Sequence, residues 1–202
     1  MATIETRAHA TPRLTHADLM SLEAYARERD AFRTRLLAHK RLRNLSVGPH
    51  TTWCFEDRLT VQYQIQEMLR AERIFEAEGI QEELDSYNPL IPDGTNLKAT
   101  LLIEYSNADE RRVALTQLKG IERRCWVGIG GERVFAIADE DLERENEEKT
   151  SAVHFLRFEL PPSARAAAKA GASIELGIDH PAYRYSVTLS AESARSLAAD
   201  LA

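Results

Sequence analysis

The sequence has few cysteines, no long apolar run and none of the short motifs that mark common catalytic sites. Its 2 cysteines, Cys54 and Cys125, stand far apart and without CxxC spacing, which excludes a self-contained zinc or iron–sulfur site of the usual kind. No apolar stretch approaches the roughly 18 residues that a membrane-spanning helix needs, so we expect no membrane span. A P-loop, a strand followed by GxGxxG, GxSxG and HExxH are all absent. Because residues 1–11 are polar and lack the apolar core of a signal peptide, and the cysteines suit a reducing compartment, we expect a cytoplasmic protein.

Charge is unevenly distributed along the chain. The 44% hydrophobic and 29% charged content is typical of a globular protein and argues against disorder. Residues 1–50 carry 9 Lys or Arg against 5 Asp or Glu, whereas residues 51–92 carry 3 against 9. The net charge of −6 argues against general nucleic-acid binding, although the basic N-terminal part leaves a phosphate or nucleotide site on the first helix as a weaker alternative.

The apolar periodicity predicts an α+β fold, with N-terminal helices packed on a mainly antiparallel β-sheet and additional short helices. Helical spacing predicts a first helix from Thr15 to about Arg43 and a second from about Asp57 to Gly79. Asn88-Pro89 and Pro92-Asp93-Gly94 predict a loop over 81–95. The chain would then divide into a helical part, 1–92, and a sheet part with short helices, 93–202, together forming one compact domain.

The sheet part shows clear strand and turn signals. Alternating apolar and polar residues predict a half-buried strand over 97–105, and Gly130-Gly131 predicts the turn of a hairpin over 125–138. Further strands are expected at 50–55, 151–160, 173–178 and 183–189, with helices over 108–119, after Pro161-Pro162 and from Ser190 to Leu201. The acidic tract over 139–149 lacks the ligand spacing of an EF-hand and is expected to be an exposed loop or short helix.

The second helix carries an unusual load of polar side chains. Its buried seam is expected to comprise Val61, Ile65, Met68, Leu69 and Phe75. Glu72 falls on the same side, where an unpaired carboxylate is costly, so an arginine of the first helix is its expected partner.

A stripe beside this seam is the candidate ligand site. Its members recur at spacings of 3 and 4 and are Glu56, Thr60, Tyr63, Glu67 and Arg70. Glu56 and Glu67 are about 16 Å apart along a helix and cannot chelate one ion together. Arg70 stands where a di-iron bundle would have histidine, which argues against a ferritin-like site.

Tyr63, Gln64 and Glu67 lie within one turn and could hold a ligand or ion with help from Glu56, Arg70 and His154 or His50. The alternatives are a polar network that locks the helix in place and a partner-docking face. Cys54 is interpreted as a small, buried, unreactive thiol.

The first helix presents a basic outer face. It comprises Arg27, Arg29, Arg33, Arg35, Lys40, Arg41 and Arg43. Such a face is typical of solvated surface, and Arg33, Arg35, Lys40 and Arg41 are also the candidate residues for docking an acidic partner.

Three stretches together resemble an uncharacterised bacterial family, the domain of unknown function 3501. They are Gly48-Pro49-His50 with Phe55-Glu56, Tyr63-Gln64-Ile65-Gln66-Glu67-Met68-Leu69-Arg70-Ala71-Glu72-Arg73, and Lys149-Thr150-Ser151-Ala152-Val153-His154-Phe155-Leu156-Arg157-Phe158, joined by Tyr87-Asn88 and Leu90-Ile91-Pro92. The resemblance extends over nearly the whole chain and brings no established activity, catalytic residue or cofactor. Members of this family are often encoded near rubrerythrin-like and iron–sulfur oxidoreductase proteins, so the resemblance implies an accessory role in redox or peroxide defence.

The sequence therefore leads to two functional hypotheses. The first is a non-catalytic accessory or adaptor protein that docks a redox or iron–sulfur partner through the basic helix face. The second is a metal- or small-molecule-binding enzyme that uses the Glu56, Tyr63, Gln64 and Glu67 face.

Overall fold

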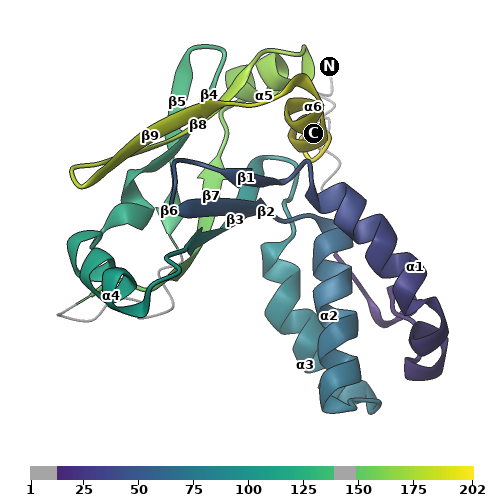
Figure 1. Ribbon diagram of the computed structural model, residues 1–202. Coiled ribbons are helices and arrows are strands. Elements are labelled where there is room, and N and C mark those ends of the chain that lie inside the picture. Colours follow the sequence, from purple (N-terminus) through teal and green to yellow (C-terminus); the bar gives the residue numbers. More distant parts are fainter. Residues whose placement is uncertain (1–12, 139–148) are drawn as a thin grey trace, which may run out of the picture.

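The computed structural model describes residues 13–138 and 149–202 and has the predicted α+β fold (Figure 1). Its strands form two antiparallel sheets, each with one face on a shared core. The predicted N-terminal tail and almost all of the acidic tract over 139–149 lie outside the described residues. Among the helices that the structure describes, none combines the length and apolarity that crossing a bilayer requires.

The first sheet has five strands. In spatial order they are β1 (Asn44–Ser46), β2 (Thr51–Phe55), β3 (Asn96–Ile103), β7 (Val153–Glu159) and β6 (Ile137–Ala138). The alternation predicted for residues 97–105 is confirmed, because buried and half-buried residues alternate along β3. Residues 50–55 were expected to pair with the sheet or to lie across its edge; of these, Thr51–Phe55 form β2 and pair antiparallel with β3.

The second sheet has four strands. In spatial order they are β5 (Glu132–Phe135), β4 (Cys125–Ile129), β8 (Ile174–His180) and β9 (Tyr183–Thr188). The predicted hairpin turn is confirmed, since Gly130 and Gly131 have φ values of 60° and 86°, which glycine adopts without a Cβ penalty. After β5 the chain leaves this sheet, and residues 137–138 pair with β7 of the first sheet as β6.

The main hydrophobic core lies between the two sheets. Trp53, Phe55 and Phe158 of the first sheet stack in it, with ring centroids 5.5 Å apart for Trp53 and Phe158. The helices α4 (Ala108–Gln117), α5 (Pro162–Lys169) and α6 (Ala191–Ala198) and the short η3 (Ile121–Arg124) contribute residues to the same core.

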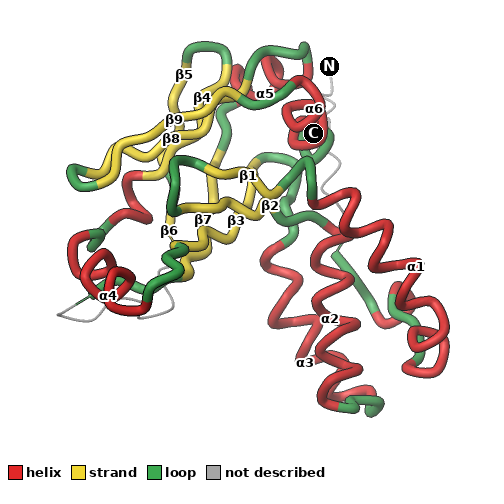
Figure 2. Tube along the Cα trace, viewed as in Figure 1, coloured by secondary structure: helices red, strands yellow, loops and turns green. Residues whose placement is uncertain are grey.

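The N-terminal helices form a second, smaller core beside the first sheet. They are η1 (His16–Asp18), α1 (Leu22–Lys40), α2 (Arg58–Glu72), α3 (Ala77–Tyr87) and η2 (Asn88–Leu90). Val61, Ile65 and Leu69 of α2 pack there against Leu84 of α3 and Ile91. Figure 2 shows α1, α2 and α3 projecting side by side away from the strands.

The structure corrects the predicted ends of these helices. α1 begins at Ser21, whose side chain accepts from the Ala24 N–H, and Thr15 caps the separate η1 instead. α2 ends at Glu72 because Arg73 adopts a left-handed conformation with φ 56°. The chain then turns and forms α3, so residues 81–87 of the predicted loop over 81–95 are helical.

Two side chains were placed on the wrong surface as a result. Phe75, predicted in the buried seam, lies beyond the end of α2 and is 71% exposed. Glu72 is the last residue of α2 and is exposed, so it needs no buried partner. The prediction continued the helix to about Gly79, whereas α2 stops at Glu72. The sequence gives no sign of this stop, because the left-handed position is occupied by Arg73 and not by glycine.

Candidate functional site

The outer face of the first sheet, which points away from the main core, carries two cross-strand rows of side chains that border the candidate site. Strand register places Cys54, Thr100 and Phe155 side by side on β2, β3 and β7. In the next row the Glu56 N–H donates to the Lys98 carbonyl, and Lys98 is in turn opposite Arg157. Directly opposite residues of antiparallel strands have Cβ atoms roughly 5 Å apart, so both rows bring side chains from distant sequence positions into contact range.

Glu56 is the buried carboxyl group of this face. It stands at the junction of β2 and α2 and is only 6% exposed. Its Oε2 accepts from Thr60 Oγ1 at 2.6 Å and from Gln64 Nε2 at 3.1 Å, and its Oε1 accepts from Thr100 Oγ1 at 3.1 Å. All three donors are neutral, and no lysine or arginine in the described parts of the chain forms an ion pair with Glu56.

Lys98 and Arg157 provide positive charge in the same row. Lys98 Nζ donates to the Pro89 carbonyl at 2.6 Å and to the Ile91 carbonyl at 3.0 Å, which uses two of its three N–H donors. Burial lowers the pKa of Lys98, with Asp93 acting in the opposite direction. Arg157 pairs with Glu159 on the same strand, and its side chain is 44% exposed.

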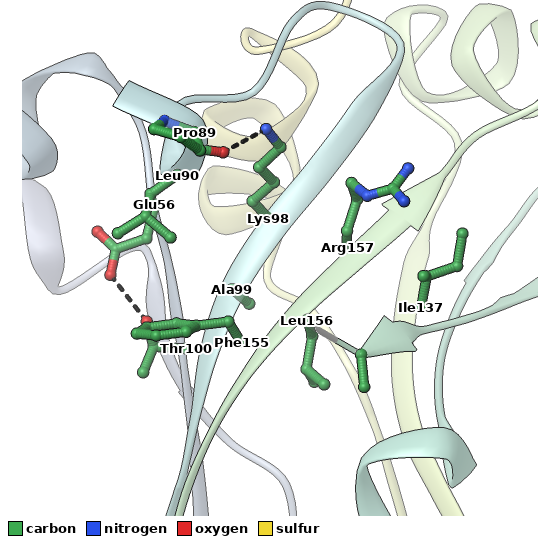
Figure 3. Close-up of a pocket in the computed structure, with 11 residues that line it drawn as sticks. Glu56, Pro89, Leu90, Lys98, Ala99, Thr100, Ile137, Phe155, Leu156 and Arg157 are labelled. Atoms are coloured by element: carbon green, nitrogen blue, oxygen red, sulfur yellow. Dashed lines mark hydrogen bonds between the residues drawn. The ribbon is translucent and has the colours of Figure 1, made fainter. Parts of the chain in front are cut away.

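These groups surround a cavity of about 610 Å³, which we call the Glu56 cavity (Figure 3). In Figure 3 the Glu56 carboxylate points toward Thr100, whereas Lys98 points toward Pro89. The cavity is lined by Glu56, Pro89, Leu90, Lys98, Ala99, Thr100, Ile137, Ala138, Phe155, Leu156 and Arg157. It therefore lies where the helical part meets the sheet, with β6 on its far side.

Of the sequence-predicted ligand residues, Glu56 lines this cavity, and Gln64 contacts Glu56 without lining the cavity itself. Glu56 precedes Asp57, the N-cap of α2, so it leaves β2 on the outer face of the sheet and does not continue the helical stripe. Gln64 reaches back from α2 to bond it.

Tyr63 and Glu67 of the stripe face α1, whereas Thr60 bonds Glu56. Glu67 accepts a bidentate pair of bonds from Arg29 at 2.7 and 2.8 Å and a third bond, also 2.7 Å, from the Tyr25 hydroxyl. The Arg29 hydrogen bond is the main reason that the pKa of Glu67 falls to about 2. Tyr63 stacks on Phe32 with 5.9 Å between ring centroids, and Arg70 lies 3.8 Å from Glu67. These contacts join α2 to α1.

The two remaining glutamines of α2 hold the segment that precedes α1. Gln66 is fully buried, accepts from the Met20 N–H at 2.6 Å and donates to the Met20 carbonyl at 3.3 Å. Gln62 donates to the Asp18 carbonyl at 2.6 Å. Much of the polar load of α2 is thus explained by contacts that fix its neighbours.

The two histidines of the sequence-based hypothesis lie elsewhere. His154 alternates with Phe155 along β7 and is buried on the core side, where Thr150 Oγ1 and the Ser151 carbonyl lie 3.0 Å from its Nε2. His50 stacks on Tyr105 beyond the end of β3.

The candidate docking residues lie on or just beyond α1. Arg33, Arg35 and Arg41 are exposed and Lys40 is half-buried, with the Arg35 guanidinium 4.9 Å over the Phe32 ring. Two other members of the predicted basic face are engaged: Arg29 binds Glu67, and Arg43 is 1% exposed and contacts Asp200. The prediction of a solvated side chain is therefore wrong for Arg43.

Neither a metal cluster nor a reactive thiol is found in the part of the chain that the structure describes. Those residues contain no group of three or more His, Cys, Asp or Glu side chains that could hold a metal ion. Both cysteines are free. Burial raises the pKa of Cys54 to about 11 and that of Cys125 well above its usual value, which disfavours the thiolate that a nucleophile requires.

Sequence reasoning missed Lys98, Thr100, Phe155 and Arg157 as possible site residues. A signal for them did exist, because they occupy outward positions of strands whose inward positions, His154 excepted, are mostly apolar. The sequence could not show that these two strands are neighbours or that Glu56 joins their row, because both facts depend on long-range pairing.

Comparison with known proteins gives a family and no activity. A family model described as "Protein of unknown function (DUF3501)" matches residues 13–201, which confirms the resemblance noted in the sequence. A crystal structure of a "novel protein of unknown function" from Burkholderia pseudomallei K96243 is 52% identical in sequence. That match covers 95% of this chain and 100% of the other, with a TM-score of 0.89. No curated protein matches the chain.

Proposed function

Because the chain belongs to the DUF3501 family, whose description names no function, its own geometry must supply one: we propose that it binds a small organic molecule in the Glu56 cavity. The volume of about 610 Å³ falls within the roughly 300–1,000 Å³ of ordinary ligand pockets. The mixture of apolar walls with a few convergent polar groups is also typical of such pockets. A reaction is not part of the proposal.

The observation that carries the proposal is the environment of the Glu56 carboxylate. A buried ionised carboxylate is costly unless it is paired, and the described residues give Glu56 only neutral donors. Thr60, Gln64 and Thr100 use three of its roughly four lone-pair positions, which leaves one on Oε1. A bound molecule with a donor group would complete this site.

Ligand binding would stabilise the folded protein, which gives a direct test. A library of small organic compounds would be screened by thermal unfolding, and compounds that stabilise the protein would be checked by ligand-observed NMR. A ligand at 100 times its Kd adds about 2.7 kcal/mol, which corresponds to a rise in Tm of roughly 5–10 °C for a chain of this size.

Two matched variants localise the binding. Thr100→Trp places an indole in the cavity and should abolish the stabilisation. Leu102→Trp makes the same change two residues along the same face of β3, outside the cavity lining, and should keep it. The proposal fails if no compound binds, or if the compounds that bind stabilise Thr100→Trp as much as the parent protein.

A second candidate function is an accessory role in which α1 docks an acidic protein. It is supported by a stripe in which the exposed side chain of Leu37, 46% accessible, lies between exposed Arg33 and Arg41 at helical spacing. None of the ion pairs found among residues 13–138 and 149–202 involves either arginine. An apolar residue flanked by cations suits a salt-sensitive protein interface. The family resemblance suggests a redox or iron–sulfur protein as the partner, and the two free cysteines suggest the cytosol as the setting.

This role predicts binding to a purified rubrerythrin-type or iron–sulfur oxidoreductase protein that weakens with salt. Arg33→Glu, Arg35→Glu and Arg41→Glu together should abolish the binding. Arg111→Glu, Arg112→Glu and Arg184→Glu change the net charge equally on other exposed surfaces and should preserve it. Equal binding by the two triple variants would contradict the docking role.

A further inference from the structure

The charges around the Glu56 cavity define the class of molecule that fits it. We propose that its ligand is a zwitterion, an organic acid that also carries an amine, with the ammonium on Glu56 and the carboxylate between Lys98 and Arg157. This inference rests on the proposed small-molecule function and specifies its substrate class.

The two ends of the cavity have opposite charge and a fixed separation. Glu56, Lys98 and Arg157 come from three adjacent strands in one cross-strand row. Neighbouring strands are about 4.8 Å apart, so Glu56 and Arg157 are separated by about 10 Å across the sheet. A ligand that reaches both ends therefore needs its two charges several ångströms apart, farther than in an α-amino acid.

The end at Glu56 favours a cation with N–H donors. The free lone-pair position on Oε1 can accept one charge-assisted hydrogen bond, which is roughly twice as strong as a neutral one. A divalent metal ion is a poorer occupant, because Glu56 is the only carboxylate among the lining residues that the structure describes. An ammonium group supplies the missing positive charge with directional donors.

The end at Lys98 and Arg157 favours an anion. Like charges directly opposite on a sheet repel each other, and Arg157 acts to lower the pKa of Lys98, whereas Asp93 and the Arg157 partner Glu159 act to raise it. The Pro89 and Ile91 carbonyls leave one Lys98 N–H available. A carboxylate between the two side chains would accept that donor and offset the repulsion.

The middle of the cavity favours an apolar body between the charged groups. Phe155 lies in the row beside Lys98, and Leu90 and Ile137 stand on opposite sides of the sheet face (Figure 3). A benzene ring or a short methylene chain would bury its surface against these three side chains.

Four compounds of nearly equal size separate the contributions of the two charges. They are 4-(aminomethyl)benzoate with both charges, 4-methylbenzylamine with the cation, 4-methylbenzoate with the anion and 4-methylbenzyl alcohol with neither. Binding to the full chain would be measured by isothermal titration calorimetry at low salt. We expect the zwitterion to bind at least tenfold more tightly than either singly charged compound, with the alcohol weakest.

Charge-neutralising variants assign each preference to its residue. In Glu56→Gln the amine should no longer increase the affinity, whereas the carboxylate should still do so. In Lys98→Met the carboxylate should no longer increase the affinity, whereas the amine should still do so. Glu104→Gln and Lys169→Met neutralise exposed side chains outside the cavity and should leave all four affinities unchanged. Because the compound series works on the unaltered protein, the inference stays testable even if Lys98→Met folds poorly.

The outcomes separate this inference from the function on which it rests. The proposal of a zwitterionic ligand would be overturned by equal affinities for the four compounds. It would also be overturned if Glu56→Gln still bound the amine compounds more tightly. If these compounds do not bind but another library compound binds in a manner that Thr100→Trp abolishes, the zwitterion is wrong and the small-molecule function stands. If nothing binds the cavity, both are wrong.

Discussion

Two glutamates of similar sequence context, Glu56 and Glu67, occupy opposite electrostatic environments. Glu67 has a bidentate arginine, whereas Glu56 has three neutral donors. The sequence placed both on one stripe of one helix. The structure separates them because Glu56 lies before the N-cap of α2, where the outward direction of β2 sets its position. The residue with the unmet charge is the one at the cavity.

The paired carboxylate, Glu67, gives a pH-dependent prediction. Its pKa is about 2 in the folded protein against 4.5 ordinarily, so its contribution to stability is fully present above pH 4.5 and is lost as pH falls toward 2. We expect Glu67→Gln to lower the free energy of unfolding by about 1–3 kcal/mol at neutral pH. That deficit should shrink as the pH falls below 4.5.

Urea denaturation at several pH values would measure this deficit. Glu28→Gln is the matched control, because it neutralises an exposed carboxylate on α1. It should cost less than about 0.5 kcal/mol at any pH. A deficit for Glu67→Gln that stays constant from neutral to acidic pH would show that charge pairing with Arg29 is not the source of the stability.

Strands with a clear local alternation of polarity were predicted correctly. The ends of the helices and the assignment of strands to sheets were not, because they depend on contacts with distant parts of the chain. The strand β3 and the β4–β5 hairpin follow from local alternation and from Gly130-Gly131. The helix α3 was missed because Asn88-Pro89 and Pro92 mark its end region as loop, although the residues before them are free to form a helix. Local spacing likewise could not reveal that β5 and β6 belong to different sheets.

The contact between α2 and the segment before α1 rests on Gln66. Its amide pairs with both the N–H and the carbonyl of Met20. Gln66→Ala would leave both backbone groups without this partner in a half-buried position. We expect a loss of about 2–4 kcal/mol in the free energy of unfolding, since each unsatisfied buried polar group costs roughly 1–3 kcal/mol. Chemical denaturation would measure it.

Hydrogen exchange would show whether the effect is local. The amides of η1 and the first turn of α1 should lose protection in Gln66→Ala, while those of β4 and β8 should change only by the global loss. Gln117→Ala, at an exposed position on α4, is the control and should be nearly neutral. Unchanged protection around Met20 would show that the Gln66 amide does not hold the segment before α1 in place.

At the scale of the whole molecule, two hydrophobic cores meet at two polar junctions. One is the Glu56 cavity, where Leu90 of the helical core faces the outer side of the sheet. The other is Arg43, which follows α1 and is 1% exposed. Its guanidinium donates to the Phe55 and Glu56 carbonyls at 3.1 Å and pairs with Asp200 beyond α6. Ligand pockets occur preferentially at such boundaries between packed units, which suits a binding role for the first junction.

The second junction should control the stability of the entire chain. Arg43→Met keeps an aliphatic side chain but leaves Asp200 buried without its cation. Breaking a buried ion pair from one side costs about 3–5 kcal/mol, or a fall in Tm of roughly 6–20 °C for a chain of this size. Arg41→Met, two residues away and exposed, should change Tm by less than about 2 °C.

The pH dependence identifies Asp200 as the reason for that loss. Burial raises the pKa of Asp200 from 3.8 to about 6 even though Arg43 acts to lower it. The folded state therefore holds the proton more tightly than the unfolded state, and the stabilising contribution of the protonated group is lost as pH rises from about 4 through 6. Without Arg43 this pKa rises further, so the loss of stability caused by Arg43→Met should be smallest near pH 4 and grow toward neutrality.

Adding Asp200→Asn to Arg43→Met should recover a large part of the lost stability at neutral pH and flatten the pH dependence of that loss. If the double variant is no more stable than Arg43→Met, the carbonyl bonds to Phe55 and Glu56, and not the unpaired carboxylate, hold this junction together.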